Sequence, residues 1–573
     1  MVSPPSLMDD VDAVQAQIAR NMLQSGDWVT ARLDGVPYLE KAAPWYWEMA
    51  AAYALFGAHD WSARIPGALA AVLLCWLVAR FGEWAFGKEA GTYAGLCIAT
   101  CVGLFLFTRI LIPDCTLTLA IAAALFSMLR LLDEADLPRK DRSILWPILF
   151  WVSLAAGVLL KGVIGVLFPA AIAIIYLLAT GRFRQRKAWQ SFRPALGIIL
   201  FLVIAAPWHV LATIRNPPTL DFTMHSESGS YRGFFWFYFI NEHVLRFLDR
   251  RYPRDYNTVP RGLFWLYHLL WLFPWSFYLP SVFKLKYRPA TRASSVRLLG
   301  VIWVAVVLVF FSFSTTQEYY TMPCYPALAL LIGSALASGD KWLRASTRMV
   351  GALAGAAAAA ILFILYAVRN TPAPGDISDA LTQHPEAYSL SLGHMNDLTL
   401  QAFAYLRLPL VVAALAFAIG AAVAWSGSKA GRTRAVFGFA IMMVLFFHAA
   451  RLALVRFDPY LSSRPLAEAL LKAPEGQLIV DNEYYDFSSV FFYTNRTALL
   501  LNGRRMNLEY GSYAPGAPNV FINDSDLSRL WSGSAQYYLV TKGQRLPELE
   551  RILDPATLHV VKESGSKYLL SNR

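Results

Sequence analysis

Long apolar runs, separated by short polar segments, recur through most of this 573-residue chain. A run of about 18 or more residues with few charges is typical of a membrane-spanning helix. Hydrophobic residues make up 56% of the chain and charged residues only 16%, whereas soluble domains have about 45–50% and about 25%. We therefore expect a polytopic, all-α membrane protein with about twelve visible transmembrane helices. We place them near 61–80, 90–108, 115–131, 144–160, 163–179, 194–213, 262–283, 298–314, 321–338, 349–368, 403–425 and 435–453.

Basic side chains gather in alternate loops between these runs. Lys and Arg concentrate in one set of loops, at 130–142, 182–193, 284–297, 341–348 and 429–434. The positive-inside rule places such loops in the cytoplasm. The other set, which includes 1–60, 214–261 and everything after 454, then faces the periplasm or exterior of a bacterial inner (plasma) membrane. The formal charge of +12 is explained by this topology, so no nucleic-acid partner is expected.

Both ends of the chain lie outside in this arrangement. The N-terminus would then have to cross the membrane without a leading helix. We therefore expect that a first transmembrane helix is missing from the start of this sequence.

Residues 454–573 show a different pattern from the transmembrane domain expected over 1–453. Short runs typical of strands alternate there with runs typical of helices, which predicts a small extramembrane α/β domain. Strands are predicted at 477–481, 489–493, 519–522 and 536–541, and helices at 463–473 and 546–553.

Acidic residues on the external side are the first candidates for catalysis. Asp9, Asp10 and Asp12 precede an amphipathic run, and Asp114 lies at the outer mouth of two spans. A carboxylate just outside the bilayer can act as a general base toward an acceptor hydroxyl or amine. An acidic residue at membrane depth is costly and by default indicates a functional site. The structural alternative is helix capping, both for the first three residues and for Asp114.

Basic residues on the external side need an anionic partner. Lys161 lies between two apolar runs, and the loop 214–261 carries Arg246 and Arg250. A lipid-linked phosphate would supply that partner. The alternatives are a lysine that extends toward the interface and neutralisation of the arginines by Asp249 or by lipid head groups.

A polar external turn supplies a further group of candidates for substrate binding. An amide, a carboxylate and two phenols follow one another at Gln317, Glu318, Tyr319 and Tyr320. Such side chains suit contacts with a sugar or a diphosphate, and the alternative is an interfacial aromatic belt.

A divalent metal ion is the one cofactor that the sequence raises. His243 with Glu40 or Glu242 could provide ligands for it. A single histidine is more often a structural hydrogen-bonding residue. The five cysteines contain no CxxC pair, so they indicate neither a zinc site nor a disulfide framework.

The motifs of this chain follow one another in a recognisable order. They are Val11–Arg20, Ser25–Trp28, Tyr38–Lys41, Asp114, Lys161-Gly162, Pro207-Trp208, Glu242-His243, Pro274-Trp275 and the stretch 314–326. This order resembles the large-loop membrane glycosyltransferases of the GT-C superfamily. It is most similar to the bacterial aminoarabinose transferase of lipid A and its relatives, near the protein O-mannosyltransferases. The resemblance covers residues 7–340.

The resemblance implies an inverting, direct displacement. A first-loop Asp would deprotonate or orient the acceptor, which attacks the anomeric carbon of a polyprenyl-phosphate sugar. Lys and Arg side chains, Lys41 of the third motif among them, would stabilise the departing phosphate. One departure concerns the acid: the family's leading Asp falls on Val11 and its Glu on Asp12. Asp10 or Asp9 takes the Asp role only after a shift of one or two residues.

We therefore predict a membrane glycosyltransferase that moves a sugar from a polyprenyl-phosphate donor to a lipid such as lipid A, or to another envelope acceptor. The alternatives are a protein O-mannosyltransferase-like enzyme, a multi-span transporter and an inactive relative. A transporter would place polar residues near the bilayer midplane and often shows inverted repeats. In this chain the polar residues gather at one face, and no repeat is apparent.

Overall fold

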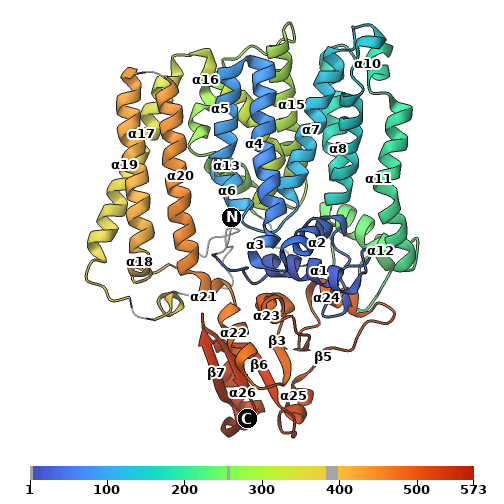
Figure 1. Cartoon of the computed structure of the whole chain (residues 1–573), viewed down its shortest axis with the longest axis vertical. Helices are drawn as coiled ribbons and strands as arrows, with labels where there is room; N and C mark the ends of the chain where they lie inside the picture. The colour runs from blue at the N-terminus through green and yellow to red at the C-terminus, as the bar shows by residue number, and fades with distance from the viewer. Residues whose placement is uncertain (1–3, 255–258, 374, 382–397, 431) are drawn as a thin grey trace.

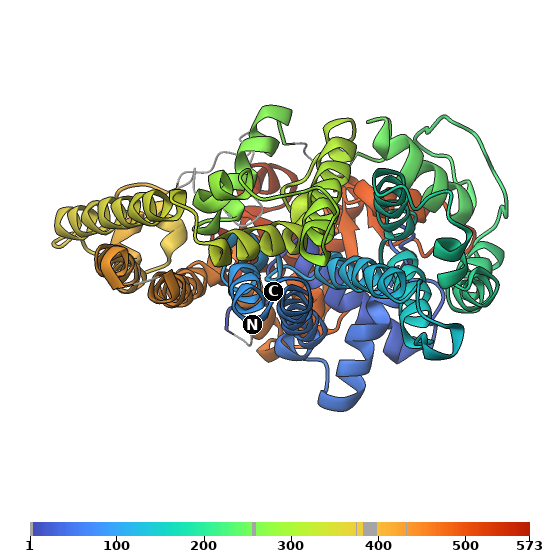
Figure 2. The same ribbon diagram turned by 90° about the horizontal axis from the view of Figure 1, so that it is seen from above.

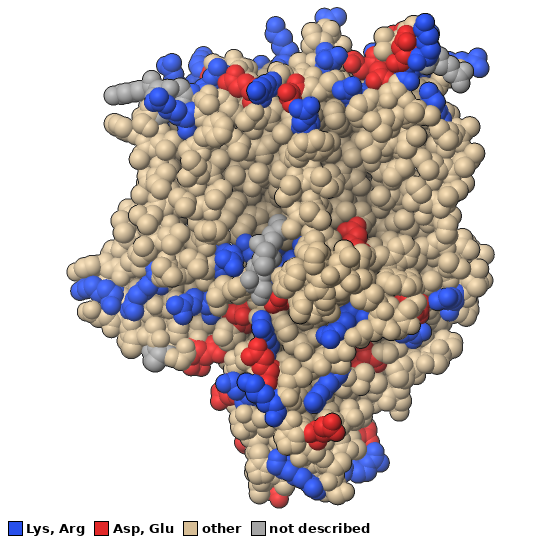
Figure 3. Space-filling model, viewed as in Figure 1, with Lys and Arg blue, Asp and Glu red and all other residues tan. Residues whose placement is uncertain are grey.

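The computed structural model describes residues 4–254, 259–373, 375–381, 398–430 and 432–573. Long helices stand side by side in one layer, and the first helices of the chain lie with the C-terminal sheet at one end of that layer (Figure 1). Seen from above, the helices form an elongated array that has α17, α19 and α20 at one end (Figure 2). Figure 3 shows charged side chains at both ends of this face and a broad belt with few charges between them.

Apolar helices account for most of the predicted spans. Within the described ranges, eight helical segments are long and apolar enough to cross a membrane. They are Asp60–Phe86 (α3 and α4), α7 (Asp114–Asp133), α11 (Pro194–Arg215), α15 (Arg292–Ser312), Glu318–Ser338 (η4 and α16), α17 (Trp342–Ala367), α19 (Arg407–Ala430) and α20 (Arg432–Arg456). Two shorter apolar helices, α8 (Leu145–Lys161) and α9 (Ile164–Ala179), coincide with two further predictions.

Two predicted spans are not single helices. The run 90–108 divides into α5 (Lys88–Ala99) and α6 (Val102–Phe107), because the backbone leaves the helical conformation at Cys101. The run 262–283 divides into α13 (Arg261–Trp271), η3 (Trp275–Tyr278) and α14 (Leu279–Val282). Pro274 lies at this second break, where it lacks the N–H that a continuous helix requires. The expectation of one continuous helix was wrong at both places.

Small residues let α4 (Ile65–Phe86) and α5 approach each other closely. A Cβ added to Gly91 of α5 would lie 2.5 Å from the backbone nitrogen of Glu83 and 2.6 Å from the carbonyl oxygen of Ala79. Only glycine therefore fits at this crossing, as is common where apolar helices pack without a hydrophobic driving force.

The segment before the first long helix folds into a compact unit at one end of the helix layer. It contains α1 (Val11–Ser25), the strand pair β1 (Arg32–Leu33) and β2 (Val36–Pro37), and α2 (Pro44–Phe56). Gly26 ends α1 in the left-handed conformation, and Pro44 begins α2 at a position where its missing N–H costs nothing. These elements lie at the end of the helix layer (Figure 1).

The C-terminal part is built around a mixed sheet in the order β5-β4-β3-β6-β8-β7. The first four of these strands are parallel, and β8 and β7 are antiparallel. The strands are β3 (Gln477–Asp481), β4 (Ala498–Leu501), β5 (Phe521–Ile522), β6 (Tyr537–Lys542), β7 (His559–Ser564) and β8 (Lys567–Ser571). The helices are α21 (Asp458–Leu461), α22 (Arg464–Lys472), α23 (Ser488–Thr494), α24 (Met506–Ser512), α25 (Asp524–Trp531) and α26 (Leu546–Ile552).

Most predicted elements of this part are confirmed, and one is wrong. The strands at 477–481, 519–522 and 536–541 coincide with β3, β5 and β6, and the two predicted helices are α22 and α26. The run 489–493 forms the helix α23 instead of a strand. Its apolar side chains are buried together, and Asn495 ends the helix in the left-handed conformation with its N–H donated to Phe491.

The N-terminal segment and the C-terminal sheet share one hydrophobic core. Ile18 and Met22 of α1 belong to the same buried cluster as Leu478 and Val480 of β3. Phe491 of α23 packs in this cluster too. The two ends of the sequence therefore complete a single packed unit, although more than four hundred residues separate them.

Candidate active site

Charged side chains from distant segments meet where the N-terminal segment contacts the helix layer. Glu40 and Lys41 follow β2, Asp114 begins α7, and Lys161 ends α8. Arg246 follows η2 (Trp236–Leu245), a π-helix. Tyr319 and Tyr320 belong to η4 (Glu318–Cys324).

Asp114 and Lys161 form the first half of this site. The Lys161 ammonium lies 2.6 Å from Oδ1 of Asp114. It also lies 5.1 Å from the ring centroid of Tyr319 and 4.8 Å from that of Tyr320, within the range of a cation–π contact. Oδ2 of Asp114 is buried and has no hydrogen-bond partner within the described residues. The pair therefore presents one buried carboxylate oxygen that remains available to a ligand.

Glu40 is the centre of the second half. Its carboxylate accepts hydrogen bonds from the Tyr38 hydroxyl and, at 2.9 Å, from Nδ2 of Asn507. Lys41 lies 3.5 Å from it and Arg246 lies 3.9 Å from it. Burial alone would raise the pKa of Glu40, but the positive charges of Lys41, Arg251 and Arg246 outweigh burial and lower it. Glu40 is consequently an anion that positions cations, and it is a poor proton acceptor.

Arg246 and Arg251 are held by the same carboxylate. Glu242 pairs with Arg246 at 2.9 Å and accepts a hydrogen bond from Nε of Arg251. Arg251 also donates to the carbonyl of Pro253 and to the side chain of Asn507, and only 4% of it is exposed. This network fixes the orientation of Arg246 toward Glu40.

The two halves form one electrostatic unit. Lys161 is within interaction range of Lys41 and Arg246 as well as Asp114. Tyr319 is within range of Asp114, Arg246 and Glu40. The site thus combines three cations with two carboxylates, and it borders helices that are apolar enough to lie in lipid.

The three acidic residues near the N-terminus have other surroundings. Asp9 pairs with Lys567 at 2.6 Å and accepts hydrogen bonds from Ser463 and Ser489, so it joins the two ends of the chain. Asp12 is buried, accepts from the N–H of Leu111 at 2.9 Å, and pairs with Arg64 at 3.4 Å.

Asp10 is exposed and precedes α1 without a side-chain cap. Its backbone contacts Tyr485 and Ser488 of the C-terminal part. Contacts join these three residues to the C-terminal part, to Leu111 and to Arg64. The catalytic role of Asp9, Asp10 and Asp12 stays a prediction. Burial raises the pKa of Asp12 against the opposing charge of Arg64.

His243 was predicted as a possible metal ligand together with Glu40 or Glu242. His243 contacts backbone groups through both ring nitrogens, the carbonyl of Tyr238 at 2.6 Å and the N–H of Val163 at 3.3 Å. In the described part of the chain, no three His, Cys, Asp or Glu side chains are grouped so that they could hold a metal ion. Glu40 and His243 therefore belong to no such group.

Arg250 is exposed, and its side chain makes no hydrogen bond or ion pair with any described residue. The buried neighbour Arg251, and not Arg250, pairs with Glu242. Glu318 is 1% exposed at the start of η4, and Gln317 precedes it. The substrate contacts of Gln317, Glu318, Tyr319 and Tyr320 stay predictions.

Sequence reasoning missed several members of the site. Arg251 was one basic residue among several in the loop, and nothing in the sequence marks it as the buried one. Asn507 lies in the C-terminal part, 467 positions from Glu40, so no local pattern connects the two. Tyr38 belongs to the motif Tyr38–Lys41, and this motif was the only feature of the sequence that pointed to it.

Sequence comparison finds similarity to known transferases. The family model described as dolichyl-phosphate-mannose-protein mannosyltransferase matches residues 41–210. An undecaprenyl phosphate-alpha-4-amino-4-deoxy-L-arabinose arabinosyl transferase from Pseudomonas aeruginosa is 30% identical over 346 residues. This match covers 56% of the chain and 54% of the relative, so it spans about half the length of that protein. A protein of the same name from Erwinia tasmaniensis is 24% identical over 557 residues, which cover 94% of the chain and 89% of the relative.

Structural comparison extends the similarity to the whole chain. The crystal structure of ArnT from Cupriavidus metallidurans bound to undecaprenyl phosphate superposes with a TM-score of 0.78 at 23% identity. It covers 99% of this chain and 94% of that one. The multi-pass helix layer and the C-terminal mixed sheet are therefore shared. The chain is therefore similar in sequence to bacterial aminoarabinosyl transferases, and it is a multi-pass membrane protein with the fold of the Cupriavidus metallidurans ArnT structure.

Proposed function

We propose that this protein transfers a sugar from an undecaprenyl-phosphate-type donor to lipid A or another acceptor of the cell envelope. One observation carries the proposal: Lys41, Lys161 and Arg246 converge beside Asp114 and Glu40 at the end of an apolar helix layer. Three cations suit a phosphate, and the neighbouring apolar helices suit a prenyl chain. The names of the relatives support the same donor class.

The charge of the carrier phosphate grows during the reaction. A sugar-loaded phosphate diester carries about one negative charge, and the released monoester carries nearly two. Lys41, Lys161 and Arg246 therefore bind the departing phosphate more strongly than the bound donor, and this difference lowers the activation barrier.

Asp114 supplies the group that faces the acceptor. The acceptor oxygen attacks the anomeric carbon, and its proton passes to Oδ2 of Asp114, which has no other partner among the described residues. The bond between the anomeric carbon and the phosphate oxygen breaks at the same time, and the carrier phosphate leaves. This assignment replaces the expected first-loop base, since Asp9 and Asp12 are engaged in packing contacts.

The names of the relatives favour one sugar, and the basic loops favour one side of the membrane. The matched relatives carry 4-amino-4-deoxy-L-arabinose in their names, so this pentose is the first donor to test. The family model favours mannose and a protein acceptor as the second. The basic segment around α10 (Arg186–Ser191) lies at the end of the helix layer opposite the site (Figure 1). The positive-inside rule then places the site at the periplasmic face.

Reconstitution with defined donors tests the proposal. The full chain in proteoliposomes is given undecaprenyl-phosphate aminoarabinose with lipid A, and products are read by mass spectrometry. A mass increase of one aminoarabinose on lipid A is expected, and Lys161→Ala should reduce it strongly. A parallel reaction with polyprenyl-phosphate mannose and a protein acceptor tests the second donor. If donor is neither consumed nor hydrolysed with any acceptor, the proposed transfer is wrong.

A further inference from the structure

The parallel strands of the C-terminal sheet end at one edge, and a pocket opens there. β4 and β5 lie on one side of β3, whereas β6 lies on the other, so the chain order reverses between β3 and β6. Crevices outside the carboxyl ends of parallel strands, at such a reversal, are favoured ligand sites. The pocket has a volume of about 820 Å³, in the range of small-molecule sites.

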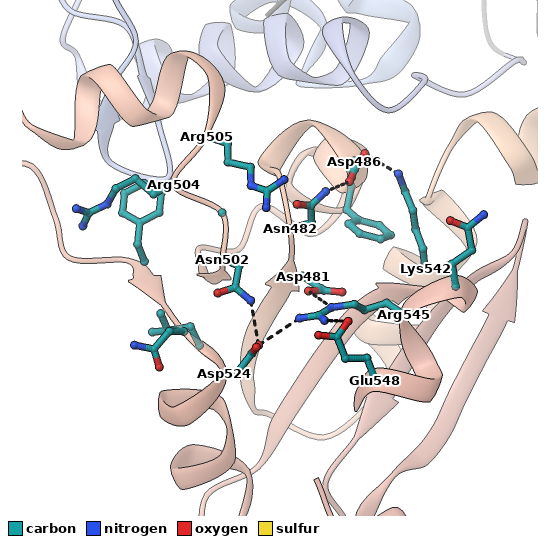
Figure 4. Close-up of a pocket in the computed structure, with 16 residues that line it drawn as sticks. Asp481, Asn482, Asp486, Asn502, Arg504, Arg505, Asp524, Lys542, Arg545 and Glu548 are labelled. Atoms are coloured by element: carbon teal, nitrogen blue, oxygen red, sulfur yellow. Dashed lines mark hydrogen bonds and ion pairs between the residues drawn. The ribbon is translucent and has the colours of Figure 1, made fainter. Parts of the chain in front are cut away.

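Polar side chains line this pocket and are held by one another (Figure 4). Arg545 bridges Asp481 at 3.5 Å and Asp524 at 3.2 Å, and Lys542 lies 2.7 Å from Asp486. Glu548 also pairs with Arg545, so four carboxylates share these two cations, and the pairs hold the carboxylates in place. Each carboxylate oxygen has more than one acceptor position, so the floor retains capacity for donors from a ligand.

Amides add groups that both donate and accept hydrogen bonds. Asn482 donates to Asp486 at 2.8 Å, and Asn502 donates to Asp524 at 2.9 Å. The ring of Phe521 forms an apolar part of the wall. Fixed carboxylates and amides beside an aromatic ring match a ligand with several hydroxyl groups on an apolar ring face, which is the chemistry of a sugar.

Arg505 at the rim provides a positive charge for a ligand. Its side chain is exposed, and its guanidinium makes no hydrogen bond or salt bridge with any residue that the structure describes. Figure 4 shows Arg505 extending toward Asn482, whereas Arg504 turns away from the pocket. Arg504 lies over the rings of Tyr513 and Phe521. A guanidinium in this position suits a carboxylate or phosphate through paired hydrogen bonds.

We propose that this pocket binds an anionic saccharide, a sugar ring that carries a carboxylate or a phosphate. Its hydroxyls contact the carboxylates and amides of the floor, and its anionic group contacts Arg505. The pocket is separate from the site around Asp114 and Glu40, and equilibrium binding to it requires no sugar transfer.

The two loops that leave the pocket both reach the candidate active site. After β3, the chain continues to Tyr485, whose hydroxyl donates to the Tyr38 hydroxyl oxygen at 3.0 Å. After β4, the chain passes Arg505 and continues to Asn507, which donates to Glu40. Arg505 at the pocket rim therefore lies only two positions along the chain from the residue that contacts Glu40.

Binding of simple probes to the full chain in detergent tests this proposal. The probes are glucuronate and glucose 1-phosphate, and the controls are neutral glucose and inorganic phosphate, each measured by saturation-transfer NMR and calorimetry. We expect at least one anionic sugar to bind about tenfold more tightly than glucose or phosphate. The two anionic probes distinguish a carboxylate ligand from a phosphate ligand.

Matched variants locate the binding. Arg505→Ala should weaken binding of the anionic sugar about tenfold, and Arg505→Lys should restore part of it. Arg529→Ala is the control, since Arg529 is an exposed arginine of α25 paired with Asp526 outside the pocket. Unchanged unfolding temperatures would show that the variants fold. Failure of both anionic sugars to bind, equal binding of inorganic phosphate, or equal effects of Arg505→Ala and Arg529→Ala would each overturn the proposal, whatever the transfer assay shows.

Discussion

Asp114 has two oxygens in different surroundings. Oδ1 contacts the Lys161 ammonium at 2.6 Å, and Oδ2 is buried without a hydrogen-bond partner among the described residues. The Lys161 ammonium therefore occupies one oxygen of this carboxylate, and the other oxygen has no partner among the described residues. This asymmetry distinguishes Asp114 from Glu40, which several cations and hydrogen bonds already occupy.

Replacing Asp114 tests its role in proton transfer. Asp114→Asn keeps the shape of the side chain but removes its basicity, so kcat should fall about 10²–10⁴-fold. KM for the donor should change much less, because the cations remain. Steady-state kinetics in proteoliposomes provide the measurement, and exposed Asp141 changed to Asn is the control. Near-normal kcat in Asp114→Asn would assign the base elsewhere.

Arg246 is predicted to act through its planar fork as well as its charge. Arg246→Lys keeps the charge but loses the paired geometry toward Glu242 and phosphate, so kcat/KM should fall about tenfold. Arg254→Lys is the matched control in the same loop, since its guanidinium is exposed and pairs with the exposed Asp249 at 3.4 Å. Equal kinetics for both variants would remove Arg246 from the phosphate site.

Glu48 of α2 makes folding depend on pH. Burial raises its pKa from 4.5 to about 7, so the folded protein binds a proton that the unfolded chain has released. Stability is then greatest below pH 4.5 with respect to this group, and it falls as the pH rises toward 7. Above pH 7, the burial of Glu48 lowers the free energy of unfolding by at most about 3 kcal/mol.

Glu48→Gln should therefore raise the unfolding temperature at pH 8 by several degrees, and the gain should shrink toward pH 5. Thermal unfolding followed by intrinsic fluorescence checks this, with exposed Glu475→Gln as the control. A gain that is the same at both pH values would contradict a titrating Glu48.

The helices and strands show how much of this fold the sequence predicted. The length of the apolar runs alone located the long helices, because a chain segment in lipid must form its backbone hydrogen bonds internally, as a helix does. It did not locate the breaks within 90–108 and 262–283, since a hydropathy pattern is insensitive to a single nonhelical residue. Strands β4, β7 and β8 were missed. The helix α23 was predicted as a strand, because a short buried apolar run fits either element.

The sequence predicted only part of the candidate site. Asp114, Lys161 and Arg246 stand out as charges beside apolar runs, where their cost indicates a function. Asn507 and Arg251 are ordinary polar residues in polar segments, and only the packing of the C-terminal part against the first loop brings them to Glu40.

Asp9 links α1 to the elements of the C-terminal sheet. Its carboxylate and the Lys567 ammonium are both about nine-tenths buried. Asp9→Ala would leave that ammonium buried without its partner, at a cost of about 3–5 kcal/mol. We expect a marked fall in unfolding temperature but near-normal kcat in the folded fraction. Arg529→Ala, which removes the exposed side chain of the pair with Asp526, should change little. Loss of kcat in well-folded Asp9→Ala would return Asp9 to the catalytic residues.

For the whole molecule, the two ends of the helix layer should face different compartments. The helices α10 and α25 lie at opposite ends of the structure (Figure 1). Arg186 begins α10, Ser534 follows α25, and both residues are exposed. In a background without the native cysteines, Arg186→Cys should be protected from an impermeant thiol reagent in intact cells, and Ser534→Cys should react. The reverse labelling pattern would place the site in the cytoplasm.

The hydrophobic core shared by the two chain ends also sets the order of biogenesis. Residues of α1 emerge from the ribosome long before β3 and α23, which complete their packing. At about 5–20 residues per second, the wait is on the order of half a minute or longer. During that time the early segment must remain unassembled while the intervening helices insert. A nascent chain that stops before β3 therefore leaves an exposed apolar surface, which quality-control proteases can recognise.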